Sequence, residues 1–277
     1  MEVHLRVLNM EVKALVISGN GTNCEMETAY ACRYAGASTD IIHLSNILNG
    51  NSRISNYHFL NLAGGFLDGD DLGSAQVESI RLKYARIKGE GPTLLEEIIN
   101  FINNGGLILG VCNGFQTLVK AGLLPGNPIG KRRVSITFND SARFEDRWVR
   151  LAINRKSPCV FTKGLDQIEL PVRHGEGKFV TDTQHTLKEI LEGNLATAFY
   201  SDKEGSPTMA YPDNPNGSVG AIAGVCDVTG RIFGLMPHPE AYTHATNHPL
   251  WTRLSLPERG QGLAIFDNAV KFLKGIR

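Results

Sequence analysis

The sequence predicts an α/β fold in which a central, mostly parallel sheet carries helices on both faces and a smaller antiparallel sheet is added. Two observations indicate this class. Short apolar runs alternate with helical patterns through the first half of the 277 residues, which is the order that parallel sheets with crossover helices require. After about residue 133 the pattern changes to alternating polar and apolar segments, which are typical of antiparallel or edge strands.

The first half is read element by element from its apolar runs and stop signals. Residues 12–18 are rich in β-branched side chains and predict a buried strand. Thr22 and Glu25 have the spacing of a capping box, which predicts a helix that Gly36 ends. Pro92 suits the first turn of a later helix. The remaining predictions are strands at 39–44, 58–62 and 107–111 and helices at 74–87, 92–103 and 113–121.

The second half predicts more strands and a closing helix. The final helix, at 262–274, has apolar residues at helical spacing. We find no internal repeat and no low-complexity linker, so we expect one domain over 1–277 with its core at about 12–275. The strands are expected at 133–138, 148–153, 168–172, 195–200, 220–225 and 232–236.

Composition narrows the class of function. The chain has 28 basic and 28 acidic residues and a net charge of zero, which argues against a nucleic-acid-binding protein. Its five cysteines form no C-x-x-C pair, so we expect no disulfide framework or zinc site and a cytoplasmic location. Residues 1–10 lack the apolar run of a signal peptide, and no window has the length of a membrane span.

One motif has the pattern of a catalytic nucleophile. Residues 110–114 (GVCNG) end a predicted buried strand and begin a predicted helix, with Cys112 at the centre. This is the pattern of a nucleophile elbow, in which a sharp turn exposes the central side chain at the carboxyl edge of the sheet. The helix N-terminus that follows favours a thiolate. We therefore predict that Cys112 is a catalytic nucleophile.

A cysteine nucleophile needs a base, and the base needs an orienting group. His238 follows a predicted strand, and Pro239 favours an extended backbone that would set Glu240 beside the imidazole. The glycine pair at 64–65 exposes backbone N–H groups, so Gly65 and Asn113 are predicted to form an oxyanion hole. Gln116 lies one helical turn after the cysteine, on the same face, where it could contact a polar substrate.

These segments together resemble the class I, triad-type glutamine amidotransferases, whose fold is flavodoxin-like. The narrower resemblance is to the glutaminase component of phosphoribosylformylglycinamidine synthase, and it extends over about residues 12–274. The segments that carry it are Asn23-Cys24-Glu25, Gly64-Gly65-Phe66, Gly69-Asp70, GVCNGFQ at 110–116, His174-Gly175-Glu176-Gly177, Asn216-Gly217-Ser218 and Met236-Pro237-His238-Pro239-Glu240.

The resemblance implies a reaction and an assembly. Cys112, His238 and Glu240 would hydrolyse glutamine, which Gln116 and the segment Gly175, Glu176 and Gly177 would hold. The ammonia would pass to a PurL-like synthetase subunit, which would use ATP and Mg²⁺ to convert formylglycinamide ribonucleotide into formylglycinamidine ribonucleotide in purine biosynthesis. A small PurS-like third subunit is a further expected partner. The chain itself has no G-x-x-x-x-G-K-[ST] loop, so we expect no cofactor or metal of its own.

Some features depart from the family, and other functions stay open. The family commonly has arginine after His-Pro-Glu, whereas this sequence has Ala241, and it has extra residues around 74–91 and 242–260. The alternatives are a glutaminase subunit of a different amidating synthetase, a non-catalytic glutamine-sensing regulator, and a cysteine peptidase or hydratase. A regulator would be expected to lose a member of the triad, and all three members are present here.

Overall fold

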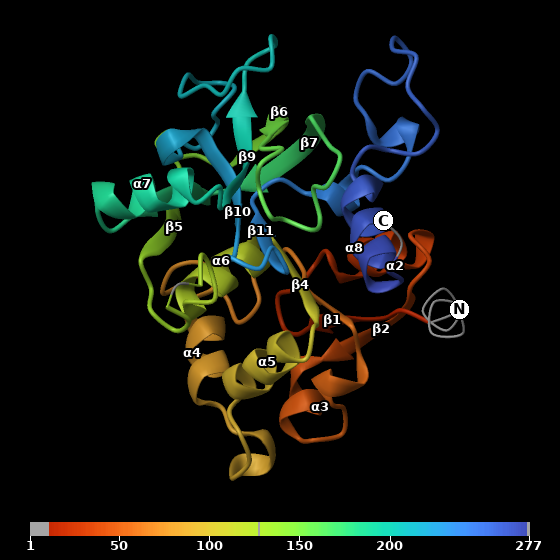
Figure 1. Cartoon of the computed structure of the whole chain (residues 1–277), viewed down its shortest axis with the longest axis vertical. Helices are drawn as coiled ribbons and strands as arrows, with labels where there is room; N and C mark the ends of the chain where they lie inside the picture. The colour runs from red at the N-terminus through yellow and green to blue at the C-terminus, as the bar shows by residue number, and fades with distance from the viewer. Residues whose placement is uncertain (1–10, 127, 276–277) are drawn as a thin grey trace.

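The structure is a computed structural model that describes residues 11–126 and 128–275, so the first ten residues, read above for a signal peptide, lie outside the described part. Its centre is a nine-stranded sheet in the order β2-β1-β3-β4-β11-β10-β9-β6-β7. Figure 1 shows this sheet running through the whole molecule, with helices packed against it. The predicted α/β class is confirmed.

Half of the sheet is parallel, as the apolar runs predict. Its four neighbouring pairs, β2-β1, β1-β3, β3-β4 and β4-β11, are all parallel. The central strands β3 and β4 are buried along their whole length, which explains why they read as continuous apolar segments. These strands are β1 (Lys13–Ser18), β2 (Ser38–His43), β3 (Phe59–Leu62), β4 (Leu107–Val111) and β11 (Ile232–Leu235).

The rest of the strands are antiparallel. The sheet continues from β11 through four antiparallel pairs, and two strands form a separate small sheet. The added antiparallel sheet is thus β5-β8, while most of the alternating segments extend the main sheet. The strands are β5 (Val134–Phe138), β6 (Glu145–Ile153), β7 (Gln167–His174), β8 (Glu176–Thr181), β9 (Ala196–Ser201) and β10 (Ile222–Cys226).

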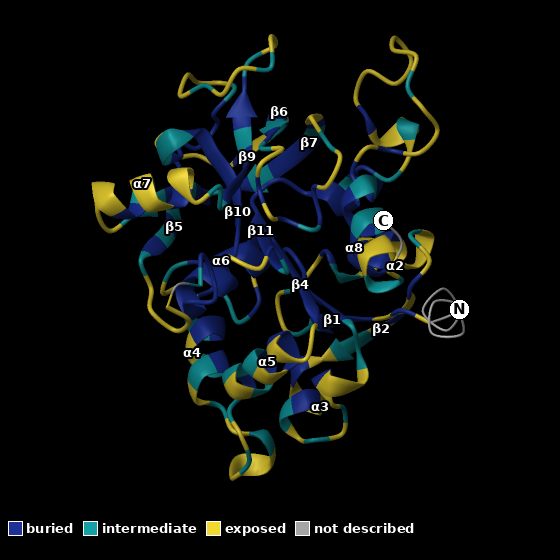
Figure 2. Cartoon of the chain, in the orientation of Figure 1, coloured by how far each residue is buried: buried dark blue, intermediate teal, exposed yellow. Residues whose placement is uncertain are grey.

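The helices cover both faces of the parallel half. In Figure 1, α2 and α8 lie together on one side of the strands, and α4, α5 and α6 lie on the other. Figure 2 shows the buried residues concentrated in the strands and on the inner helix faces. The helices are α2 (Glu25–Tyr34), α3 (Leu44–Leu48), α4 (Gln76–Tyr84), α5 (Leu94–Asn103), α6 (Asn113–Ala121), α7 (Gln184–Glu192) and α8 (Leu263–Leu273).

Two predicted helix starts are wrong in detail. Thr22 does not cap α2: its hydroxyl accepts from the N–H of Gly19, and the N-cap residue is Cys24, without a side-chain cap. A capping box does occur at α5, between Thr93 and Glu96. Pro92 therefore precedes the cap instead of lying in the first turn. At Thr22 the short polar side chain could serve either a helix cap or a turn, and the structure uses it in the turn with Gly19.

The sequence analysis missed the short helix α3, the helix α7 and the strand β8. Leu187, Ile190 and Leu191 lie at helical spacing in α7, so the helical pattern is present in the sequence although only Thr186 and Ile190 are buried. β8 begins at Glu176, directly after β7 ends at His174, so the His-Gly-Glu-Gly segment is a tight strand-to-strand connection. That connection brings Glu176 to the edge where β4 ends, as the cavity described below shows.

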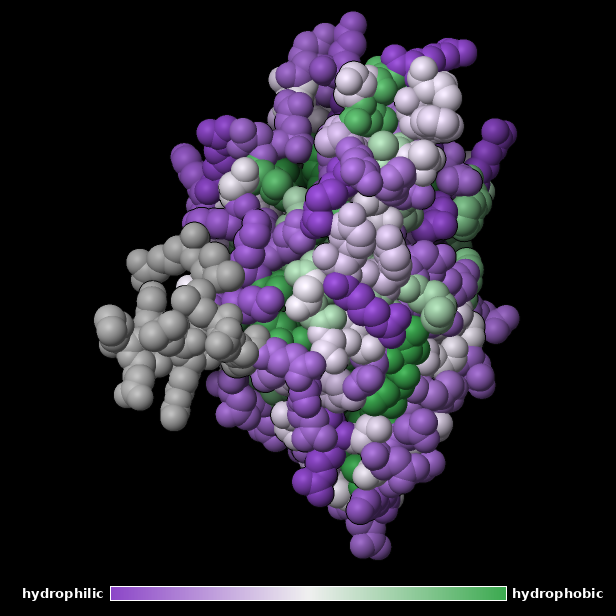
Figure 3. All heavy atoms as spheres, turned by 90° about the vertical axis from the view of Figure 1, so that its right-hand side faces the viewer, coloured by the Kyte–Doolittle hydropathy of each residue, from purple (hydrophilic) through white to green (hydrophobic). Residues whose placement is uncertain are grey.

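The helices, the surface and the cysteines can be compared with what the composition led us to expect. Within the described residues, no helix combines the length and apolar character needed to cross a membrane. Figure 3 views the side that carries α2 and α8, and there the hydrophobic residues occur in separate groups among hydrophilic ones wherever the grey residues leave the face visible. All five cysteines are free thiols, as expected for a chain without disulfides.

Candidate active site

The turn between β4 and α6 has the geometry of a nucleophile elbow. Cys112 has φ +51° and ψ −105°, a conformation that non-glycine residues rarely adopt. The flanking glycines are required by packing: a Cβ on Gly110 would lie 2.6 Å from Leu118 Cδ1, and a Cβ on Gly114 would collide with the carbonyl of Leu62. The strained turn holds the thiol at the carboxyl edge of the sheet.

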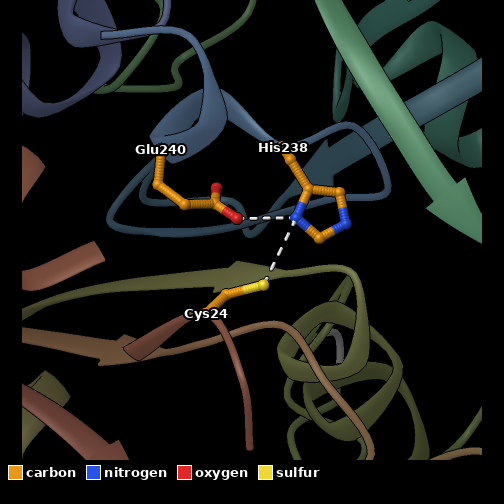
Figure 4. Close-up of side chains that lie close together, drawn as sticks. All are labelled: Cys24, His238 and Glu240. Carbon is orange, nitrogen blue, oxygen red and sulfur yellow. Dashed lines mark hydrogen bonds and ion pairs between the residues drawn. The ribbon is translucent and has the colours of Figure 1, made fainter. Parts of the chain in front are cut away.

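His238 and Glu240 form a buried pair beside this elbow. The imidazole Nδ1 lies 2.6 Å from Glu240 Oε1, and both residues are 2% exposed (Figure 4). His238 is extended, as predicted, but Glu240 lies in a 3-10 turn, Pro239–Ala241. The carboxylate therefore reaches the ring by a turn of the backbone rather than along a straight strand.

Electrostatics favour a charged imidazole. Burial by itself lowers the pKa of His238, but the charge of Glu240 and the contact with Cys112 more than offset this, and the pKa lies well above its usual value. The other ring nitrogen, Nε2, is buried and has no hydrogen-bond partner among the described residues. It is free to exchange a proton with a substrate held at Cys112.

The glycine pair after β3 lies against the same imidazole. A Cβ on Gly64 would meet His238 Cε1 at 2.8 Å, and Gly65 has φ +137°. Gly65 lines the cavity together with Cys112. Asn113 is the first residue of α6, so its N–H belongs to the first turn, which a helix leaves without an intrahelical acceptor. Both predicted oxyanion-hole residues therefore adjoin the thiol.

These groups face a cavity of about 290 Å³. It holds three carboxylates and one arginine, Arg173, besides the imidazoles, so it offers both signs of charge to one small ligand. The lining residues are Asn23, Cys24, Glu27, Gly65, Phe66, Asp70, Ser74, Cys112, Gln116, Phe144, Arg173, His174, Gly175, Glu176 and His238.

Three of the four predicted substrate-binding residues line this cavity, and one does not. Gln116 donates from Nε2 to the carbonyl of Glu176 at 2.6 Å, which fixes the amide at the wall. Gly177 lies outside: its N–H donates to Asn139 Oδ1 at 2.9 Å, and a Cβ there would run into the ring of His174. A glycine is needed there for packing, and the predicted role of Gly177 in holding the substrate stays a prediction.

The structure adds cavity residues that the sequence analysis did not single out as binding groups. Asp70 and Ser74 come from the loop after β3, where Asp70 Oδ1 is buried without a partner among the described residues. The guanidinium of Arg173 lies next to the triad, with Nη2 3.5 Å from His238 Nδ1. His174 is held by Asn139, and burial lowers its pKa to about 3, so it is neutral. Asp70 and His174 belong to segments that carry the family resemblance, whereas no local pattern marks Ser74 or Arg173, which the fold brings here from distant segments.

One group of side chains has the residue types and spacing of a metal site, and it consists of Cys24, His238 and Glu240. Cys24 Sγ lies 4.0 Å from His238 Nδ1, and the ligand atoms of Cys24, His238 and Glu240 lie within 4.8 Å of one another (Figure 4). The short His238–Glu240 hydrogen bond already uses two of these atoms. The guanidinium of Arg173 lies 4.0 Å from Cys24 Sγ. Its positive charge opposes the binding of a metal cation by these side chains.

Comparisons with known proteins agree with this geometry. Residues 11–273 match the family model of the CobB/CobQ-like glutamine amidotransferase domain. The chain is 43% identical to phosphoribosylformylglycinamidine synthase subunit PurQ of Dehalococcoides mccartyi, over 96% of this chain and 99% of that one. It is 41% identical to the same subunit of Methanococcus maripaludis, over 94% and 97%. A chain in the solved structure of PurLQS from Thermotoga maritima superposes with a TM-score of 0.69 at 25% identity, covering 95% of this chain and all of that one.

Proposed function

This chain belongs to the glutamine amidotransferase family and, within it, to the PurQ subunits of phosphoribosylformylglycinamidine synthase, and from that premise we propose how its residues release ammonia from glutamine. The observation that carries the proposal is the strained elbow of Cys112, which sets a thiol in a cavity beside the buried His238–Glu240 pair. The match to the glutamine amidotransferase family model supports glutamine as the substrate.

In the first half-reaction, the sulfur of Cys112 adds to the side-chain amide carbon of glutamine. The N–H groups of Gly65 and Asn113 receive the oxyanion, and the imidazolium of His238 gives its Nε2 proton to the departing nitrogen. The C–N bond breaks, ammonia leaves, and a γ-glutamyl thioester remains on Cys112. Glu240 holds Nδ1, which keeps the imidazole oriented and favours its charged form.

In the second half-reaction, water hydrolyses the thioester. Neutral His238 takes a proton from the water at Nε2, and the oxygen adds to the thioester carbon. The C–S bond then breaks, glutamate leaves, and Cys112 and protonated His238 are restored. No oxidant, reductant or metal takes part, and we propose that the chain carries no cofactor of its own.

The two charges of the amino acid set its orientation in this proposal. Among the described residues, Arg173 is the only lysine or arginine that lines the cavity, and we assign it the α-carboxylate. Asp70, with an unpartnered carboxylate oxygen, is assigned the α-ammonium. Gln116, Gly175 and Glu176 complete the polar wall. Each charged group of the zwitterionic amino acid thus faces a side chain of opposite charge, although the amino acid has no net charge.

We propose that the ammonia serves a synthetase subunit that binds ATP and Mg²⁺ and aminates formylglycinamide ribonucleotide. The name PurLQS of the similar structure supports an assembly with a PurL-like subunit and a small PurS-like one. Five free thiols suit the reducing cytoplasm, where we propose that the complex works.

The test separates glutamine use from amination. The chain is reconstituted with its synthetase, and product is assayed with either glutamine or ammonium as the nitrogen source. Cys112→Ala is expected to lose glutamine-dependent amination by at least about a thousandfold and to keep the ammonia-dependent rate. Cys159→Ala, which removes another buried thiol, is the matched control and should keep both. Glutamine-dependent amination by Cys112→Ala would refute the assignment.

A further inference from the structure

One carboxylic acid of this chain is buried without a cation to pair with. Glu78 of α4 is 3% exposed, and no ion pair among the described residues includes it. Arg81, one turn further along the helix, pairs instead with Asp68 at 2.8 Å. A buried, unpaired carboxylate is costly, so such a group is either neutral or strongly hydrogen-bonded.

The hydrogen bonds of Glu78 decide between these forms. Its Oε2 lies 2.5 Å from Thr117 Oγ1 on α6, and the same hydroxyl lies 2.9 Å from the carbonyl oxygen of Asn113. A threonine hydroxyl has one proton to donate, and both partners are acceptors if Glu78 is ionised. With Glu78 protonated, both contacts are satisfied: the acid donates to Thr117, and Thr117 donates to Asn113.

This chain of two hydrogen bonds ends at the elbow. Asn113 follows Cys112, and its backbone N–H belongs to the proposed oxyanion hole. Both polar atoms of its side-chain amide are hydrogen-bonded. Its Oδ1 accepts from the N–H of Leu67 at 3.2 Å, and its Nδ2 donates to Gln116 Oε1 at 3.3 Å. The contact between Thr117 and Glu78 joins α6 to α4, and the hydrogen bond from Thr117 to the Asn113 carbonyl extends it to the first turn of α6.

The surroundings oppose ionisation of Glu78. Burial raises its pKa to about 8, and Asp68 acts in the same direction, while Thr117 and Arg81 act against it only in part. Lys120 of α6 is directed elsewhere, with its ammonium on the carbonyl of Ser74.

Helix α5, which also packs against α4, places no buried charged residue near Glu78. It packs against α4 through a face whose buried residues are apolar, and its acidic first-turn residues Glu96 and Glu97 are not among them. Within the described part of the chain, neither α5 nor α6 forms an ion pair with Glu78.

We propose that Glu78, in its protonated form, is a positioning residue for glutamine hydrolysis, holding the oxyanion-hole turn through Thr117. It touches neither substrate nor nucleophile. When Glu78 loses its proton, it and the Asn113 carbonyl compete for the single Thr117 proton, the first turn of α6 loosens, and glutamine hydrolysis falls. This inference rests on the proposed glutaminase function.

The test is the pH dependence of kcat/KM for glutamine, measured on the complex with its synthetase from pH 6 to 10. The wild type should lose activity above about pH 8, by about tenfold per pH unit. Glu78→Gln keeps a donor for Thr117 that does not ionise. We expect wild-type activity at pH 7 and an alkaline midpoint at least about one pH unit higher.

The matched control is Glu97→Gln on α5, which should leave the midpoint where it is in the wild type. An identical alkaline midpoint in Glu78→Gln and wild type would overturn the proposal, as would a large loss at pH 7 in a folded Glu78→Gln protein. If that variant does not fold, the wild type still decides: its infrared spectrum at pH 7 must contain the C=O band of a protonated carboxyl that disappears with the activity, and absence of the band refutes the proposal. A wild type that hydrolyses no glutamine at any pH contradicts the proposed function instead.

Discussion

Replacing Glu78 by glutamine should stabilise the fold, and increasingly so as the pH rises. The carboxyl has an ordinary pKa of 4.5 and one of about 8 in the fold, so the folded state holds a proton that the unfolded state releases. A group whose pKa is raised on folding favours the fold fully below the unfolded value, and this advantage is lost as the pH rises through the folded value. Glutamine has no such dependence.

The magnitude follows from the difference of about 3.5 pH units between about 8 and 4.5. At about 1.4 kcal/mol per pH unit, the variant should gain roughly 5 kcal/mol over the wild type between pH 4.5 and 8, and the gap should then level off. Near pH 7 the gain should be roughly 3 kcal/mol, a large fraction of a typical domain's stability.

Urea-induced unfolding at 25 °C, measured at intervals from pH 4.5 to 9, gives the free energy of unfolding directly. Glu97→Gln should follow the wild type throughout. A gap between Glu78→Gln and the wild type that does not change with pH would refute the inference that Glu78 is neutral in the fold. This measurement needs neither substrate nor partner, so it is independent of the proposed activity.

Two further predictions concern the triad. Glu240→Gln removes the main charge that raises the pKa of His238, so NMR titration of the imidazole should give a lower pKa, and glutamine hydrolysis should fall by a factor on the order of a thousand; an unchanged imidazole pKa would contradict this role. Gly64→Ala sets a methyl group 2.8 Å from His238 Cε1 and should lower kcat at least about tenfold while circular dichroism shows an intact fold; wild-type kcat would mean that the ring position is not critical.

The elements that the sequence predicted well have local causes. The elbow could be recognised because the collisions that a Cβ would cause at Gly110 and Gly114 restrict the residue types within five consecutive positions. His238 and Glu240 could be recognised because two residues of one short segment make the pair. The parallel strands could be recognised because burial on both faces leaves only apolar residues.

What the sequence could not give is set by contacts between distant segments. Asp70 and Glu176 meet through Ser74, whose N–H donates to a carboxylate 102 residues away. Arg173 reaches His238 across 65 residues. Glu78 lies on a helix with a weak apolar stripe, where an acidic residue is normally read as solvent-exposed. Its burial follows only from the packing of α4 on α6.

The central claim is that Cys112, and not Cys24, is the nucleophile, although the structure sets Cys24 Sγ 4.0 Å from His238. The glutamine-analogue electrophile diazo-oxo-norleucine tests this directly, by intact mass and peptide mapping of the labelled chain. We expect one adduct, located on Cys112, that Cys112→Ala abolishes and Cys24→Ala retains. An adduct located on Cys24, or one that survives in Cys112→Ala, would contradict the account.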